Sequence, residues 1–291
     1  MVDLSVKIGK LKLKNPVMAG SGTFGAEYGE LMDIRKLGAY VAKTITLEAR
    51  IGNPPPRVCE TASGMLNSIG LENKGVGYFL EKTLPEAKKY GIPVIASIAG
   101  DDASEFAKLA ERLGGSSGVD AIELNLSCPN ITRGRGPGAG VKGQIIAQDG
   151  KAVYGIVKAV KRSTKLTVIA KLSPNVTDIA EIAKTAESAG ADALTVANTF
   201  LGMVVAIDTK RPILGNITGG LSGPAIKPLA LRMVWQVCRS VKIPVIGSGG
   251  ISDWRDAVEF ILCGASAVQV GTANFVNPAS MIEIAGGSGI I

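Results

Sequence analysis

The feature that most constrains the fold of this chain is the alternation of short apolar runs with longer segments of helical period. Eight apolar runs, most of them ending in or near Gly, Ser, Thr or Asn, span residues 16–21, 39–45, 93–100, 119–127, 167–174, 192–199, 243–250 and 266–273. Segments between them, such as 101–114, 177–190 and 252–264, begin with helix-capping residues and end on Gly, as crossover helices do. Eight strand-helix units predict an α/β fold, specifically a (β/α)8 TIM barrel.

Two segments are too long for ordinary barrel connections. Residues 46–75 follow the second predicted strand and residues 200–224 follow the sixth. Both leave the barrel at the face where active sites of such barrels lie, so we expect them to cover a functional site, with a simple surface insertion as the alternative. The length of 291 residues suits either two domains or one large barrel, and we predict a single domain over residues 1–291.

A doubly wound nucleotide-binding domain is the rival fold. Residues 20–25, GSGTFG, match the G-x-G-x-x-G pattern after the first predicted strand. That fold places an acidic residue about 20 positions further on, at the tip of the second strand. Lys43 and Thr44 stand there instead, which favours the barrel.

Composition limits the classes of function. The net charge is +7, but the lysines are spread along the chain and aromatic residues make up only 4%. This pattern favours a site for a small anionic ligand and predicts no nucleic-acid partner. The N-terminus has no apolar signal segment, no run approaches 18 apolar residues, and the four cysteines form no C-x-x-C pair. We therefore expect a cytoplasmic protein with no membrane partner and no metal site of its own.

The chain contains no histidine, which excludes a Ser-His-Asp triad, an H-E-x-x-H zinc site and a histidine proton shuttle. Cys, Lys, Asp, Glu and Tyr remain as possible proton carriers. Among them Cys128 is a candidate, because it stands in ELNLSCPN at the carboxyl end of the fourth predicted strand, where Pro129 ends the strand. A buried structural cysteine is the alternative. Cys238 and Cys263 lie in helical patterns, and these two and Cys59 are expected to be structural or incidental.

Polar residues gather at the carboxyl ends of several predicted strands. They are Lys43, Thr44, Asn125, Ser127, Lys171, Ser173, Asn198 and Thr199. Lys171 is hard to explain by packing, because a buried ammonium is costly unless an anionic group meets it. Either Lys171 points into the barrel mouth toward a ligand, or the fifth strand is out of register.

The seventh and eighth strands end in GSGG (247–250) and VGTA (270–273). Barrels often bind phosphate on these loops, where glycines let backbone N–H groups approach the anion. Gly249, Gly250, Gly271 and Thr272 are the residues expected there, with ordinary tight turns as the alternative.

Four motifs, NLSCPN, KLSPNVTDI, NITGGLSGPAIKP and IPVIGSGG, together resemble the flavin-dependent dihydroorotate dehydrogenases, and specifically the class 1B catalytic subunits. The resemblance covers essentially the whole chain. It implies an FMN-bearing barrel that oxidises (S)-dihydroorotate to orotate in pyrimidine biosynthesis. Cys128 would be the catalytic base that takes the proton from carbon 5, while hydride leaves carbon 6 for the flavin.

The resemblance also implies the binding residues. Those expected to contact FMN are Ser21, Lys43, Thr44, Asn125, Lys171, Ala197, Gly223, Gly249, Gly250, Gly271 and Thr272. Those expected to hold dihydroorotate are Lys43, Asn67, Ser68, Ile69, Gly70, Leu71, Asn125, Asn198 and Thr199. A cationic lysine near the flavin would stabilise the electron-rich reduced ring, and asparagines can pair with amide and carboxylate edges.

The electron acceptor is implied by the resemblance alone. Class 1B implies that electrons pass to NAD through a partner subunit bearing FAD and a [2Fe-2S] cluster, with a homodimer of catalytic chains at the core of a heterotetramer. The first alternative is a fumarate-linked class 1A enzyme. A tRNA dihydrouridine synthase is a second alternative, but it normally carries an RNA-binding helical domain for which this chain has no room.

Three departures from the family pattern stand out. The segment after Cys128, residues 131–150, is longer and richer in Gly and Arg than expected, and the C-terminal MIEIAGGSGII replaces an expected helix-forming tail. Ser97 stands where some relatives are expected to carry asparagine. These departures concern the loop expected to close over the substrate, the last helix, which we expect to be short, and the position of Ser97 beside the flavin.

Overall fold

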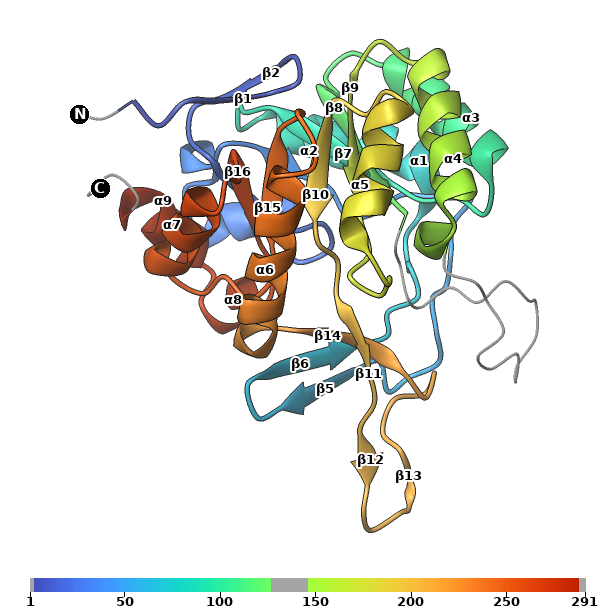
Figure 1. Cartoon of the computed structure of the whole chain (residues 1–291), viewed down its shortest axis with the longest axis vertical. Helices are drawn as coiled ribbons and strands as arrows, with labels where there is room; N and C mark the ends of the chain where they lie inside the picture. Colours follow the sequence, from blue (N-terminus) through green and yellow to red (C-terminus); the bar gives the residue numbers. More distant parts are fainter. Residues whose placement is uncertain (1–2, 127–145, 288–291) are drawn as a thin grey trace.

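A parallel β-barrel forms the centre of the computed structural model, which describes residues 3–126 and 146–287 (Figure 1). Its strands are β3 (Val17–Ala19), β4 (Tyr40–Val41), β7 (Val94–Ile98), β8 (Ala121–Asn125), β9 (Thr167–Lys171), β10 (Ala193–Val196), β15 (Val245–Ser248) and β16 (Ala267–Val270). The order of the 8-stranded sheet is β3-β16-β15-β10-β9-β8-β7-β4, and a parallel bridge between Met18 and Ala39 joins its two ends. Each strand lies within its predicted range, so the TIM barrel is confirmed and the doubly wound alternative is wrong.

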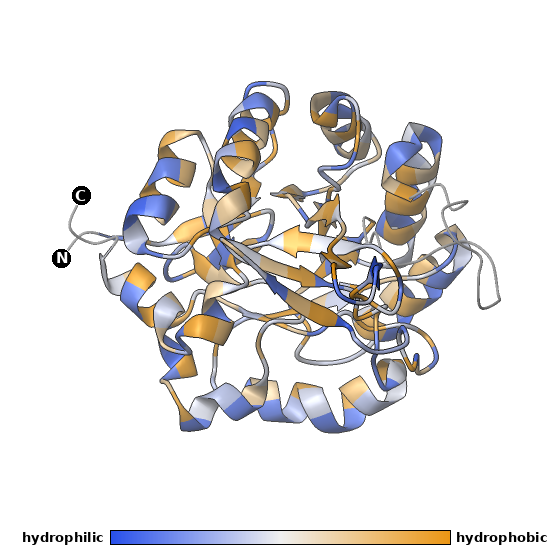
Figure 2. Ribbon diagram, turned by 90° about the horizontal axis from the view of Figure 1, so that it is seen from below, coloured by the Kyte–Doolittle hydropathy of each residue, from blue (hydrophilic) through white to orange (hydrophobic). Residues whose placement is uncertain are grey.

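Helices surround the barrel strands in a ring (Figure 2). They are α1 (Gly75–Tyr78), α2 (Leu84–Lys88), α3 (Ala103–Gly114), α4 (Gly150–Ser163), α5 (Ile179–Ser188), α6 (Lys227–Cys238), α7 (Trp254–Leu262), α8 (Ala273–Val276) and α9 (Ser280–Gly287). Asp102, Asp178 and Asp253 accept hydrogen bonds from the first backbone N–H groups of α3, α5 and α7, as their positions predict.

Shorter helical segments complete the ring, and in the first strand-helix unit they take the place of the expected α-helix. They are η1 (Ala26–Glu30), η2 (Ile34–Lys36), η3 (Phe79–Thr83), η4 (Ile146–Gln148) and η5 (Pro224–Ile226). The first crossover, residues 20–39, contains two 3-10 segments, η1 and η2, and no α-helix. Its helical residues are interrupted at Asp33, whose side chain caps η2 and starts a new turn there.

Two apolar cores hold the molecule together. One fills the space between barrel and helices, and the other lies inside the barrel. The inner core includes Ile169 and Ile246 from the barrel and Ile8, Leu11 and Leu13 from the antiparallel hairpin of β1 (Val6–Ile8) and β2 (Leu11–Leu13). This hairpin, which the sequence analysis did not predict, packs its apolar side against the inner core at the amino ends of the strands.

The two predicted insertions form one antiparallel sheet. Its strands are β5 (Val58–Thr61) and β6 (Gly64–Asn67) from the first insertion and β11 (Phe200–Gly202) and β14 (Gly219–Ser222) from the second, in the order β11-β14-β6-β5. The pair β12 (Val205–Ala206) and β13 (Arg211–Pro212) extends beyond this sheet as a narrow arm (Figure 1). The insertions therefore pair with each other at the carboxyl side of the barrel.

The last helix, α9, ends at Gly287, and the C-terminal residues 288–291 lie outside the described residues. The segment after Cys128 lies largely outside them as well, up to residue 145. In the described ranges, the structure contains no helix long and apolar enough to cross a membrane.

The hairpin gives a direct test of the inner core. Leu13 is fully buried there and Lys12 beside it is exposed. Leu13→Ala should lower the free energy of unfolding by about 3 kcal/mol, because it removes buried methyl groups and leaves a cavity. Urea denaturation checks this, with Lys12→Ala as the matched control, expected within about 0.5 kcal/mol of the parent. Equal stability of the two variants would show that the hairpin contributes little to the core.

Candidate active site

A cavity of about 700 Å³ opens at the carboxyl ends of the barrel strands and lies under the insertion sheet. Nearly all the predicted site residues line it. They are Ser21, Lys43, Thr44, Asn67, Ile69, Gly70, Leu71, Asn125, Lys171, Ala197, Asn198, Thr199, Gly223, Gly249, Gly250, Gly271 and Thr272. The volume lies within the range of small-molecule and cofactor sites. Segments spread over more than 250 residues of sequence thus meet at one place.

Ser68 and Cys128 are the two predicted site residues that are not among those named above. Ser68 is fully buried outside the cavity lining, where its hydroxyl oxygen lies 3.0 Å from Asn53 Nδ2 and its N–H donates to the Arg57 carbonyl. Cys128, the predicted catalytic residue, lies outside the described residues, as does Ser127.

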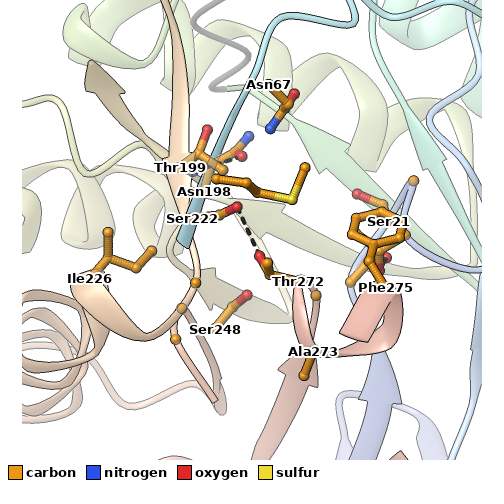
Figure 3. A pocket seen from close by; sticks show the side chains of 18 of the residues that line it. Ser21, Asn67, Asn198, Thr199, Ser222, Ile226, Ser248, Thr272, Ala273 and Phe275 are labelled. Carbon is orange, nitrogen blue, oxygen red and sulfur yellow. Dashed lines mark hydrogen bonds between the residues drawn. The ribbon is translucent and has the colours of Figure 1, made fainter. Parts of the chain in front are cut away.

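The cavity has two chemically different ends (Figure 3). Asn67, Asn198 and Thr199 gather at the end near the insertion sheet, whereas Ser248 and Thr272 lie at the other end, on the loops after β15 and β16. At this second end, the Thr272 hydroxyl donates a hydrogen bond to Ser222 Oγ at 2.8 Å. Amide groups therefore mark one end, and hydroxyl and glycine-rich backbone groups mark the other.

A chain of hydrogen bonds fixes the amide end across four barrel strands. Asn198 Nδ2 donates to Asn125 Oδ1 at 3.2 Å, and Asn125 Nδ2 donates to Thr44 Oγ1 at 3.2 Å. Thr44 Oγ1 lies 3.0 Å from Ser97 Oγ, and Ser97 is fully buried in β7. Ser97 therefore supports Thr44 from behind the cavity, and the chain orients both asparagine amides.

Lys171 ends β9 in the predicted register, opposite Asn125 of β8 and Thr195 of β10. It is only 5% exposed and lines the cavity, so the interpretation that it points into the barrel mouth is confirmed. Its ammonium donates to Gln269 Oε1 at 2.8 Å and lies 3.7 Å from Glu123 Oε1. The anionic group that meets this buried lysine is therefore part of the barrel itself.

The glycine-rich end depends on backbone conformations that only glycine adopts easily. Gly249 has φ 132° and Gly250 has φ 76°. A Cβ at Gly250 would lie 2.7 Å from the backbone N of Lys227, the first residue of α6. Glycine thus lets this loop pack directly on the start of the helix.

A partly buried ion pair ties the same loop to α6. Asp256 Oδ1 accepts from Lys227 Nζ at 2.6 Å, and Oδ2 accepts from the backbone N and the hydroxyl of Ser252 at 2.8 and 2.7 Å. Burial acts to raise the pKa of Asp256, but the hydrogen bonds from Lys227 and Ser252 outweigh it and hold the pKa below its usual value. The carboxylate thereby fixes the loop that follows β15.

The family comparison agrees with this geometry. The family described as dihydroorotate dehydrogenase matches residues 3–287, almost the entire chain. The chain belongs to the dihydroorotate dehydrogenase family.

Similar proteins share nearly the full length. The protein named dihydroorotate dehydrogenase B (NAD(+)), catalytic subunit, of Desulforamulus reducens is 54% identical over 97% of this chain and 91% of its own length. Proteins of the same name from Trichlorobacter lovleyi and Bacteroides thetaiotaomicron are 52% and 50% identical; the matches cover 98% and 99% of this chain and 91% and 93% of those proteins. A crystal structure of a dihydroorotate dehydrogenase from Eimeria tenella, in complex with ferulenol, is similar in fold, with a TM-score of 0.77 at 24% identity over 98% of this chain and 83% of that chain.

Several residues of the candidate site were missed from the sequence. Glu123 and Gln269 contact Lys171 from behind the cavity, and Ser222, Ser248 and Phe275 line it. The sequence did contain a signal for Glu123 and Gln269. Glu123 alternates with Asn125 in one strand and Gln269 interrupts another apolar strand, which is the period that places side chains inside a barrel.

The described cysteines, Cys59, Cys238 and Cys263, all lie outside the cavity lining. Burial, together with the nearby Cys263, raises the pKa of Cys238 to about 11. Burial also raises the pKa of Cys263, and Glu259 adds to the effect. Both thiols are therefore poor sources of thiolate, which agrees with the structural role expected from the sequence.

Asp256 gives a test of the loop after β15. Asp256→Asn should lower the free energy of unfolding by about 2 kcal/mol at neutral pH, because it replaces charged hydrogen bonds. Since the folded pKa lies below the ordinary value of 3.8, the carboxylate stabilises the fold above pH 3.8, and this stabilisation is lost as the pH falls through the lower folded pKa. The stability difference between parent and variant should therefore shrink below pH 3.8.

Urea denaturation at several pH values measures this difference. The matched control is Glu181→Gln, which removes an exposed helical ion pair with Lys184 and should change the stability by less than about 0.5 kcal/mol. An Asp256→Asn variant as stable as the parent at neutral pH would contradict the assigned role.

Proposed function

We propose that this chain is the catalytic subunit of an NAD-linked dihydroorotate dehydrogenase, which oxidises (S)-dihydroorotate to orotate in pyrimidine biosynthesis. Full-length relatives with 50 to 54% identity carry that name. The observation that carries the proposal is that residues from separate motifs line one cavity at the carboxyl ends of the barrel strands. The predicted single domain over residues 1–291 is part of the same proposal.

The cavity residues fit FMN. The backbone at Gly249, Gly250 and Gly271 lines the cavity without side chains, and Gly223 lies at the amino end of the helical segment formed by η5 and α6. Backbone N–H groups at such a helix end favour a phosphate. Ser21, Lys43, Thr44, Asn125, Lys171, Ala197 and Thr272 would hold the remainder. Bound FMN supplies a two-electron acceptor for the hydride that leaves dihydroorotate.

The amide end fits dihydroorotate, whose ring carries amide groups and a carboxylate. Asn67, Asn198 and Thr199 offer donors and acceptors at this end. The same cavity is lined by Asn125, by Lys43, which offers a cation, and by residues 69–71. We omit Ser68 from the binding set, because its side chain and its backbone N–H are engaged by Asn53 and Arg57.

Cys128 is proposed as the base that accepts the proton from carbon 5 of dihydroorotate. The support is the motif NLSCPN and the position of Asn125, which stands three residues before Cys128, ends β8 and lines the cavity. A thiol has a reference pKa of about 8.5, so a base at this position works best where the surroundings raise its thiolate fraction. Loss of this proton and of hydride from carbon 6 leaves the double bond of orotate.

Anaerobic mixing of the flavin-loaded protein with dihydroorotate tests the proposal. The yellow absorbance should bleach, and Cys128→Ser should keep FMN but bleach about 10²-fold more slowly or worse, because a hydroxyl is a far weaker acid than a thiol. Cys59→Ser, which changes a thiol outside the cavity lining, should bleach like the parent. No bleaching of the parent would reject the function, and unchanged bleaching by Cys128→Ser would remove Cys128 from the mechanism.

We further propose that electrons leave through a partner subunit carrying FAD and a [2Fe-2S] cluster, in a cytoplasmic heterotetramer built on a homodimer of this chain. The name of the relatives, which includes both NAD(+) and the words catalytic subunit, supports NAD as the acceptor and the existence of a partner subunit. This name also favours the NAD-linked class over the fumarate-linked class.

The isolated chain should therefore reduce artificial dyes with dihydroorotate but show little activity with NAD. Adding the partner subunit from the same cell should confer NAD reduction, which is followed as NADH absorbance. Robust fumarate-dependent turnover by the isolated chain would reject the NAD-linked assignment while leaving dihydroorotate oxidation in place.

A further inference from the structure

We infer that Glu123 is a positioning residue that orients the Lys171 ammonium through Gln269 and offsets its charge at the base of the cavity, so that reduced flavin bound there is not stabilised excessively. This inference rests on the proposed function in two respects, because it takes the bound cofactor to be a flavin and takes the electrons of that flavin to pass to NAD. Its remaining steps concern the described side chains alone.

Glu123 is a carboxylate held inside the barrel. It is fully buried in β8, and its Oε2 accepts a hydrogen bond from the Thr195 hydroxyl at 3.0 Å and another from Gln269 Nε2 at 2.6 Å. The surrounding strands therefore fix this carboxylate on two sides. A charge in such a place is costly unless it is paired.

Gln269 links Glu123 to Lys171. Its side chain is 1% exposed, so its amide has protein partners on both sides. Because Nε2 donates to the Glu123 carboxylate, Oε1 of the same amide faces Lys171, and Lys171 Nζ donates to it at 2.8 Å. A carboxylate can only accept hydrogen bonds, so Glu123 decides which way this amide points.

The charges of Lys171 and Glu123 offset each other over a short distance. Lys171 Nζ lies 3.7 Å from Glu123 Oε1, and this oxygen accepts no hydrogen bond from the part of the chain that the structure describes. Glu123 therefore acts on the ammonium through its charge and through the amide of Gln269. Lys171 lines the cavity while Glu123 lies behind it, so Glu123 acts on a ligand through the position of the lysine and, over a longer distance, through its own charge.

This arrangement has a consequence for electron transfer. A lysine cation next to a flavin favours the electron-rich reduced ring. If the cation were not offset, the reduced flavin would hold its electrons more firmly, whereas an enzyme that passes electrons to NAD, a weak oxidant, needs a flavin that releases them. A buried carboxylate behind the lysine lowers the net positive charge without occupying the cavity.

The first experiment measures the midpoint potential of the flavin in the loaded protein by anaerobic reductive titration against a reference dye. Glu123→Gln keeps the side-chain shape and removes the charge. It should favour the reduced flavin about tenfold, which is a positive shift of about 30 mV for a two-electron couple. Glu123→Asp, which retains the charge, should move the potential less than Glu123→Gln does.

Two controls separate this role from a general loss of packing. In a Lys171→Met background, Glu123→Gln should shift the potential by less than half as much, because the part that depends on the position of the lysine is gone and only the direct effect of the Glu123 charge remains. Ile122→Ala removes a fully buried neighbour that packs in the core between barrel and helices, and it should reduce stability without moving the potential. An unchanged potential in Glu123→Gln, or an equal shift in the Lys171→Met background, would overturn the inference.

A second experiment needs no flavin. In the flavin-free protein, Lys171→Met leaves the Glu123 charge buried without its cation, so it should unfold at a lower urea concentration than the double variant Glu123→Gln/Lys171→Met. If Glu123→Gln alone fails to fold, the double variant should still show a cooperative transition. A double variant no more stable than Lys171→Met would overturn the inference. This result does not depend on dihydroorotate oxidation, so it distinguishes failure of the inference from failure of the proposed function.

Discussion

Closure of the parallel sheet is the constraint on which the rest of this structure depends. Parallel strands are buried on both faces and leave open edges unless the sheet closes, and here a bridge between Met18 and Ala39 brings the first and second barrel strands together. Because all the barrel strands run in the same direction, closure also brings their carboxyl ends to one rim. The cavity is a consequence of this geometry, since the polar residues that end separate strands can meet only there.

The insertion sheet completes the site in a way that neither insertion achieves alone. Residues 46–75 supply β5 and β6, and residues 200–224 supply β11 and β14, with Gly220 paired opposite Asn67. A two-stranded hairpin alone is only marginally stable in water, whereas four strands packed against a barrel form a stable sheet. The pairing therefore holds Asn67 at the amide end of the cavity and connects it to Thr199 through the second insertion (Figure 3).

Inside the barrel, apolar and polar side chains occupy different levels along the barrel axis. The inner core toward the amino ends is apolar and closed by the β1–β2 hairpin. Above it lie Glu123, Gln269, Thr195 and Lys171, which bond to one another. In the dry interior these groups interact more strongly than they would in water, but only while each has its partners. The apolar layer below keeps water away and so strengthens the polar layer that supports the cavity.

The sequence by itself determined the barrel, because the spacing of apolar residues and the helix-capping residues are local properties. The strands, the capped helices and the two insertions follow from the order of residues. The motifs indicate the family. Lys171 was also recognisable as a residue that needs an anionic neighbour. Only the tertiary structure decided that this neighbour is Glu123, that Ser68 lies outside the cavity lining, and that the two insertions share one sheet. These facts depend on contacts between strands far apart in the chain. Local patterns of residues do not determine which distant strands and loops come into contact, so the tertiary structure was needed to identify these contacts.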